Sequence, residues 1–140
     1  MTLSLPGSDA PPSGYTKGTD GLWYKFYESL SYTKAEAQAH CAAEGATLPV
    51  ILDADTNAAV GAVVKYGFID AVLAKGRYGL AWMTENGVIL NFLPWEVSEP
   101  SGFDGETCVQ RLSTGEWNDV PCGGDAKAPF GCQWGREGEF

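Results

Sequence analysis

Hydrophobic and polar residues recur at helical spacing in the first half of the chain and form short strand-like runs in the second half. Residues 22–27 are mostly aromatic, which is typical of an opening strand. Thr33 and Glu36 have the spacing of a capping box and predict a helix that starts there and ends before Gly45. The small residues expected to let one face of this helix approach a sheet are Ala35, Ala39, Ala42 and Ala43.

A second helix is predicted to begin at Asp55 and to stop at Gly67, because apolar residues recur between them at helical spacing. After Gly67 the pattern changes to short runs of strand-forming residues separated by turn signals. The expected strands are residues 68–72, 77–83, 88–92, 107–112, 117–120 and 130–134. Two helices followed by short strands, without β-α-β alternation, predict an α+β fold with an antiparallel sheet.

The length of 140 residues is enough for one domain. We expect a flexible leader at residues 1–20, a domain at 21–135 and a flexible tail at 136–140. The formal net charge of −9 argues against nucleic acid as a partner, because affinity for phosphate backbones comes mainly from Lys and Arg. No apolar stretch approaches the roughly 20 residues that span a bilayer.

The cysteines are Cys41, Cys108, Cys122 and Cys132, and none of them forms a C-x-x-C pair. The only histidine, His40, is expected on a helix surface, so a zinc site and a catalytic triad are both disfavoured. Two disulfides formed in an oxidising compartment are the better interpretation. Four cysteines allow three pairings, and their spacing alone does not choose among them.

Oxygen-bearing side chains gather around the loop expected at residues 94–105. They are Glu99, Ser101, Glu106, Asn118 and Asp119. Calcium takes six to eight hard oxygen ligands, so this set predicts a calcium site if the loop and the strand meet. Pro100 would fix the relative orientation of its neighbours, and we expect a cis Glu99–Pro100 bond. The alternative is that each residue is a solvated loop residue of an acidic protein.

Three short motifs, in their order, resemble those of a C-type lectin-like domain. Phe68-Ile69-Asp70-Ala71 resembles the family's Trp-Ile-Gly-Leu strand, Glu99-Pro100-Ser101 its Glu-Pro-Asn motif, and Trp117-Asn118-Asp119 its Trp-Asn-Asp motif. With Glu106-Thr107-Cys108 and Phe130-Gly131-Cys132, the resemblance covers residues 23–134. It implies a double-loop fold with two helices and two small antiparallel sheets. It also implies disulfides between Cys41 and Cys132 and between Cys108 and Cys122.

The resemblance implies calcium-dependent carbohydrate binding by a secreted protein. By position, Glu99, Ser101, Glu106, Asn118 and Asp119 would hold Ca²⁺, and the same residues with Trp95 would bind a hexose whose adjacent hydroxyls complete the calcium shell. Ser101 departs from the family, which has Asn in its mannose-type motif and Asp in its galactose-type motif. Glu-Pro-Ser is similar to the motif of some invertebrate galactose binders, which slightly favours galactose over mannose.

The implied partners are mono- or oligosaccharides and glycoconjugates, and a homo-oligomer would add avidity to single weak sites. The alternative function is a calcium-independent protein-interaction module, because the fold also serves members that bind no sugar. An enzyme is not expected: Glu99 and Glu106 have the residue types of a glycosidase pair, but ligands of one ion are not free to exchange protons. For Trp95, packing in the core or loop is as well supported as stacking on a sugar, and Trp117 is expected in the core.

Overall fold

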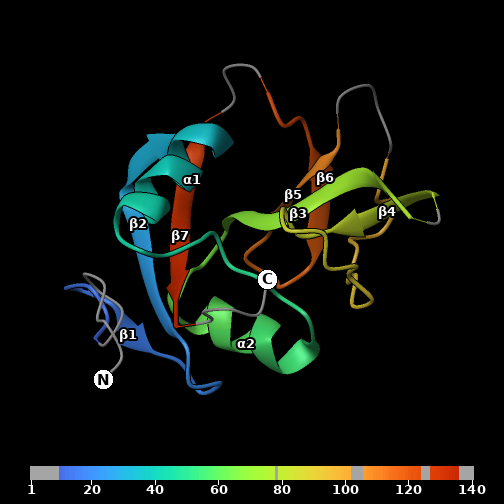
Figure 1. Cartoon of the computed structure of the whole chain (residues 1–140). Helices are drawn as coiled ribbons and strands as arrows, with labels where there is room; N and C mark the ends of the chain where they lie inside the picture. Colours follow the sequence, from blue (N-terminus) through green and yellow to red (C-terminus); the bar gives the residue numbers. More distant parts are fainter. Residues whose placement is uncertain (1–9, 78, 102–105, 124–126, 136–140) are drawn as a thin grey trace.

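The computed structural model describes residues 10–77, 79–101, 106–123 and 127–135 of the chain (Figure 1). Residues 1–9 of the predicted leader, the whole predicted tail and Tyr78 of the predicted strand at 77–83 lie outside the described residues. The elements, in chain order, are β1 (Thr16–Lys17), β2 (Trp23–Tyr32), α1 (Lys34–Ala43), α2 (Ala54–Val63), β3 (Gly67–Gly76), β4 (Gly79–Met83), β5 (Cys108–Arg111), β6 (Trp117–Val120) and β7 (Ala128–Trp134).

The strands form two small antiparallel sheets (Figure 1). One has the order β1-β2-β7, so that strands from near the two ends of the domain pair, with Trp23 opposite Trp134. The other has the order β4-β3-β5-β6 and carries β6 at its edge. Two helices with two antiparallel sheets confirm the predicted α+β class. No helix within the described ranges is both long and apolar enough to cross a membrane.

Helix α1 begins as its sequence predicts. The Thr33 Oγ1 atom accepts a hydrogen bond from the Glu36 N–H at 3.2 Å, and the Glu36 carboxylate accepts one from the Thr33 N–H at 2.9 Å. This reciprocal pair satisfies two backbone donors that the first turn of a helix leaves without partners. After Ala43 the chain turns at Gly45, whose φ of 73° favours glycine.

The prediction for the buried face of α1 is wrong. The four alanines expected to face the sheet, Ala35, Ala39, Ala42 and Ala43, are exposed. The buried residues are instead Lys34, Ala37 and Cys41, which lie three and four positions apart on one side of the helix. Because Cys41 is bonded to Cys132 of β7, the disulfide decides which side of α1 lies against the sheet.

Two further element predictions need correction. Helix α2 begins at Ala54, because the carboxylate of Asp53 caps it by accepting a hydrogen bond from the Thr56 N–H at 2.8 Å; Asp55 lies in the first turn. Residues 88–92 form no strand and make a single bridge between Ile89 and Met83. After this bridge the Leu90 N–H still donates to Trp82 O at 2.9 Å, and the chain then enters the long loop, so the pairing does not extend into a strand.

Part of the predicted leader belongs to the fold. Thr16–Lys17 pairs with β2, and Tyr15 is 8% exposed in one of the two hydrophobic clusters. The Tyr15 hydroxyl donates to Glu44 at the end of α1 at 2.7 Å. Residues 15–17 are therefore held by strand pairing and by a buried tyrosine with a hydrogen-bonded hydroxyl.

The disulfides are those that the resemblance implies. Cys41 is bonded to Cys132 and Cys108 to Cys122, with Cα atoms 5.5 and 5.1 Å apart. The first bridge lies within the cluster that joins α1 to the β1-β2-β7 sheet. The second lies at the end of the β5-β6 pair, where Cys108 is opposite Val120. Each bridge therefore supports a different sheet.

Candidate functional site

The predicted oxygen ligands come from the long loop, the start of β5 and the edge strand β6. Backbone hydrogen bonds join the loop to β6: the Trp117 N–H donates to Pro94 O and the Glu96 N–H donates to Trp117 O, both at 2.9 Å. Asn118 and Asp119 follow Trp117 on β6, and Glu106 lies two residues before β5. The loop and the edge strand therefore meet, as the calcium hypothesis requires.

Within the loop, the backbone around Glu99 is unusual. The Glu99–Pro100 peptide bond is cis, as the sequence predicts, and Ser98 has a φ of 74°, in the left-handed region that non-glycine residues rarely adopt. The Glu99 N–H donates to Glu96 O at 2.9 Å and closes this turn. The loop residues 102–105 lie outside the described residues.

Ser101 is the residue that links the loop to both strands. Its N–H donates to Asp119 Oδ1 at 2.9 Å, and its hydroxyl lies 2.5 Å from Glu106 Oε1 and 3.3 Å from Asp119 Oδ1. Asp119 is fully buried, while Ser101 is exposed, so the cluster runs from the surface into the edge of the sheet. Three of the predicted residues are thus in direct contact.

The other two residues each contribute an oxygen atom that lacks a hydrogen-bond partner. Glu99 Oε1 and Asn118 Oδ1 are buried, and within the described residues neither accepts a hydrogen bond. Leaving a buried acceptor unsatisfied costs about 1–3 kcal/mol, more for a charged group, so such atoms require an explanation. A cation that both atoms contact would provide one.

The electrostatics of the cluster agree with that explanation. Burial raises the pKa of Glu99 above its usual 4.5, and the nearby carboxylates of Asp119 and Glu106 raise it further, while a hydrogen bond from Ser101 lowers it. Three carboxylates close together repel one another, and a dication would offset that repulsion.

The donor set fits calcium in its chemistry. Among the described residues, no group of three or more His, Cys, Asp or Glu side chains is placed so that it could hold a metal ion. The cluster does offer carboxylate oxygens together with the neutral oxygens of Ser101 and Asn118, and hard oxygen donors of this mixed kind are those that Ca²⁺ prefers. The two unpartnered oxygens belong to this set.

Trp95, the predicted stacking residue, packs against other tryptophans. Its ring meets Trp82 edge-on at 4.9 Å between centroids and Trp117 at 6.1 Å, and it is partly buried against the main core cluster. Trp117 itself is fully buried, as predicted. The geometry thus gives Trp95 a structural role next to the site.

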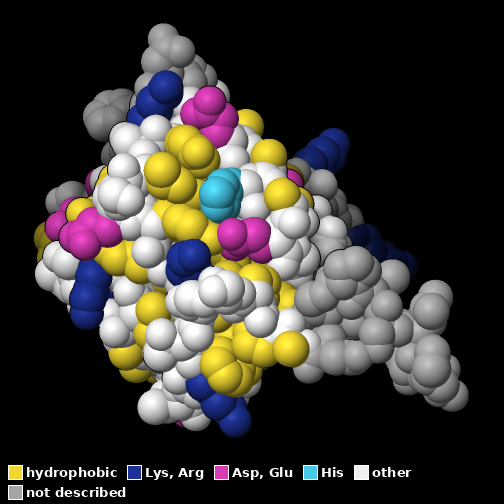
Figure 2. Space-filling model, turned by 90° about the vertical axis from the view of Figure 1, so that its left-hand side faces the viewer, with side chains coloured by type: hydrophobic (Ala, Val, Ile, Leu, Met, Phe, Trp, Pro, Cys, Tyr) yellow, Lys and Arg dark blue, Asp and Glu magenta, His cyan; other side chains and the backbone are white. Residues whose placement is uncertain are grey.

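His40 lies on the helix surface, as expected, but within a ring of aromatic side chains. Its imidazole makes edge contacts with Tyr27, Tyr32 and Phe130 at centroid distances of 4.5, 5.8 and 5.4 Å. Figure 2 shows this face of the molecule, with hydrophobic side chains around the histidine. The Nε2 atom is 3.6 Å from the Glu44 carboxylate, which gives no hydrogen bond.

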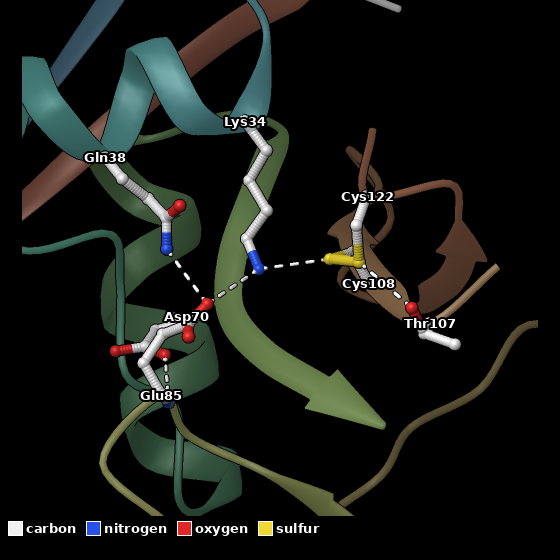
Figure 3. A network of polar contacts seen from close by, with 7 residues as sticks. All are labelled: Lys34, Gln38, Asp70, Glu85, Thr107, Cys108 and Cys122. Atoms are coloured by element: carbon white, nitrogen blue, oxygen red, sulfur yellow. Dashed lines mark hydrogen bonds and ion pairs between the residues drawn. A yellow bond between two sulfur atoms is a disulfide. The ribbon is translucent and has the colours of Figure 1, made fainter. Parts of the chain in front are cut away.

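Sequence reasoning missed a polar network beneath α1 (Figure 3). Lys34 is only 4% exposed, and its ammonium contacts Glu85 Oε1 at 3.3 Å and Cys108 Sγ at 3.2 Å. Gln38 donates to the same Glu85 oxygen, and the Glu85 N–H donates to Asp70 Oδ1 at 2.8 Å. A lysine in the first turn of a helix gives no sequence signal of burial, so only the fold brings these residues together.

The C-type lectin domain family matches residues 30–133, and the chain therefore belongs to it. Human Collectin-10 is 30% identical over 115 residues, which cover 79% of the chain but 41% of that protein. Among solved structures, the mouse scavenger receptor C-type lectin carbohydrate-recognition domain aligns with a TM-score of 0.74 at 21% identity, covering 90% of this chain and 97% of that one. A calcium-independent type II antifreeze protein aligns with a TM-score of 0.71 at 21% identity, covering 88% and 92%.

These comparisons fix the family and the fold. The chain spans less than half the length of the collectin that it matches. The two structural alignments have low identity and bear on the fold alone. One of the aligned structures is described as a carbohydrate-recognition domain and the other as calcium-independent, so membership of the family does not decide calcium dependence.

Proposed function

We propose that the chain binds carbohydrate in a calcium-dependent manner at the cluster of Glu99, Ser101, Glu106, Asn118 and Asp119. The observation that carries this proposal is the pair of buried oxygens without hydrogen-bond partners, Glu99 Oε1 and Asn118 Oδ1, together with the repulsion that Glu99 experiences from Asp119 and Glu106. A protein-interaction module that used no calcium would have no need for buried, unsatisfied acceptors on a cluster of carboxylates that repel one another.

The same residues supply the chemistry of sugar recognition. A bound calcium ion would provide the positive centre to which the oxygens of adjacent sugar hydroxyls bind. Glu99 and Glu106 accept the hydroxyl protons, and the Asn118 amide donates to a hydroxyl oxygen. We assign the preference to a hexose, with galactose slightly favoured because Ser101 stands where the mannose-type motif has Asn.

The proposed setting is extracellular, because the two disulfides suit an oxidising compartment. The proposed partners are mono- or oligosaccharides and glycoconjugates. A single hexose site is weak, so assembly of several copies would raise the avidity for a glycan-coated surface. Binding without chemical conversion of the sugar is the expected activity.

Isothermal titration calorimetry with galactose and with mannose, in calcium and in chelator, tests the proposal. We expect hexose binding in calcium and none in chelator. Glu106→Gln should abolish binding, and Glu28→Gln, on the exposed surface of β2, is the matched control that should leave it unchanged. Equal binding in both buffers would overturn calcium dependence.

A glycan array with the same two buffers separates the alternative function from the proposed one. The proposal predicts glycan signals that disappear with chelator. A protein-interaction module predicts no glycan signal in either buffer and a protein partner whose capture does not depend on calcium.

A further inference from the structure

The two disulfides have different surroundings. Cys41 and Cys132 are both fully buried, whereas Cys122 is partly exposed and Cys108 lies behind it at 1% exposure. A thiol from solvent can therefore approach the Cys108–Cys122 bridge from its Cys122 side. The buried bridge offers no such approach in the folded protein.

Polar groups contact both sulfur atoms of the partly exposed bridge (Figure 3). The ammonium of Lys34 lies 3.2 Å from Cys108 Sγ, and the hydroxyl of Thr107 lies 3.1 Å from Cys122 Sγ. In the disulfide these sulfurs are poor acceptors and carry no charge. When a thiolate opens the bridge at Cys122, Cys108 leaves as an anion, and Cys122 is released as an anion only in the second exchange. A cation or a hydroxyl donor at this distance stabilises each sulfur when it becomes anionic.

The charges that face Lys34 do not cancel this effect. Glu85 contacts the ammonium at 3.3 Å, and Asp70, which accepts a hydrogen bond from the Glu85 N–H, also interacts with the charge of Lys34. Figure 3 shows the ammonium between these carboxylates and Cys108, so the positive charge is the one nearest to the sulfur. Glu85 is 47% exposed, and water screens its charge, whereas Lys34 and Cys108 are both buried.

We propose that the Cys108–Cys122 bridge is a site of thiol–disulfide exchange with low-molecular-weight thiols. The external thiolate attacks Cys122 Sγ and forms a mixed disulfide, while the bond to Cys108 breaks and Cys108 leaves as an anion beside Lys34. A second external thiolate then attacks the sulfur of the first and releases Cys122. Two external thiols are oxidised to one disulfide, and the bridge is reduced by the same two electrons to two cysteines.

Opening this bridge would act on the proposed sugar site, and this step rests on the proposed function. Glu106 lies two residues before Cys108, and Asp119 lies three residues before Cys122. The bridge thus holds together the chain segments that carry two of the proposed calcium ligands. Reduction frees the start of β5, so calcium affinity should fall while the main core and the Cys41–Cys132 bridge stay intact.

The test measures each bridge separately in the full chain, without calcium or sugar. The folded protein is incubated with reduced glutathione, free thiols are alkylated at intervals, and the modified cysteines are identified by peptide mass. Lys34→Met keeps the apolar stem and removes the charge. Lys65→Met, at an exposed lysine, is the matched control.

We expect the Cys108–Cys122 bridge to open first, about tenfold more slowly in Lys34→Met and at the wild-type rate in Lys65→Met. Glu85→Gln removes the carboxylate that competes with the Cys108 thiolate for the Lys34 ammonium, so it should speed opening of the bridge about twofold. This variant also tests the role of Lys34 if Lys34→Met does not fold. Opening of both bridges at equal rates would overturn the proposal. So would rates that neither Lys34→Met nor Glu85→Gln changes.

A second measurement joins this site to sugar binding. Protein reduced and alkylated only at Cys108 and Cys122 is compared with the oxidised protein by calcium titration. A loss of at least tenfold in calcium affinity supports the coupling, and equal affinity removes it. If the oxidised protein binds no calcium, the proposed function fails while the result on bridge opening still stands.

Discussion

Ser101 donates its hydroxyl proton to Glu106 Oε1 across 2.5 Å, and this contact joins the long loop to the residue just before β5. The serine side chain is shorter than that of asparagine. Its hydroxyl oxygen therefore cannot reach as far toward a cation as the amide oxygen of an asparagine would. The identity of residue 101 should therefore set both calcium affinity and sugar preference.

Ser101→Asn is expected to tighten calcium binding about tenfold, because an amide oxygen on a longer side chain is a better neutral ligand. Preference should move toward mannose, since residues 99 and 101 orient the groups that receive the sugar hydroxyls. Calorimetry with calcium and with each hexose measures both effects. Ser113→Asn, in an exposed turn, is the control. Unchanged affinity and selectivity would contradict the role given to Ser101.

Glu99→Gln should separate calcium binding from folding. In chelator the variant should be as stable as the wild type or slightly more stable, because the pKa of Glu99 is raised and its charge is unfavourable in the fold. In calcium, thermal denaturation should show a smaller increase in melting temperature than in the wild type, since one charged ligand is lost. An equal increase in both proteins would count against Glu99 as a ligand.

Trp95→Ala tests whether Trp95 serves the core or the sugar. Its ring packs between Trp82 and Trp117, so truncation should lower the free energy of unfolding by about 3 kcal/mol, measured by urea denaturation. Val97→Ala, in the same loop at 86% exposure, should change it by less than about 0.5 kcal/mol. A stable Trp95→Ala protein that loses only sugar affinity would assign the ring to sugar stacking instead.

Patterns among residues that are close together in the sequence were sufficient to predict several helices and strands. The Thr33 and Glu36 pair marks the start of α1, and Trp117–Val120 forms a strand with the predicted bounds. The residues of the candidate site could be proposed because they share one kind of donor atom and fall in three short motifs. Each of these inferences needed only local chemistry, which a single sequence contains.

Features that depend on contacts between distant segments could not be predicted. The Cys41 disulfide, and not the small size of the alanines, decides which face of α1 is buried. Lys34 is buried because the turn after β4 and the start of β5 bring Glu85 and Cys108 to it, and neither is near it in the sequence. Residues 88–92 have strand character but pair with β4 only at the single bridge between Ile89 and Met83.

The ionisation of Asp70 should make the free energy of unfolding depend on pH. Burial raises its pKa above the usual 3.8, and the charge of Glu85 adds to this, while the Glu85 N–H and Lys34 lower it. The folded protein therefore holds this proton more tightly than the unfolded chain does. Stability associated with neutral Asp70 is fully present below pH 3.8 and is lost as the pH rises through the folded-state pKa.

Asp70→Asn keeps an oxygen acceptor for the Glu85 N–H and removes the ionisation. We expect the variant to gain stability relative to the wild type as the pH rises above 3.8, until the difference becomes constant above the folded-state pKa. Urea denaturation at a series of pH values measures this difference, with Asp55→Asn as the control for removing an exposed carboxylate. A difference between Asp70→Asn and wild type that does not change with pH would show that Asp70 ionises as easily in the fold as in the unfolded chain, and the desolvation argument for this residue would then be wrong.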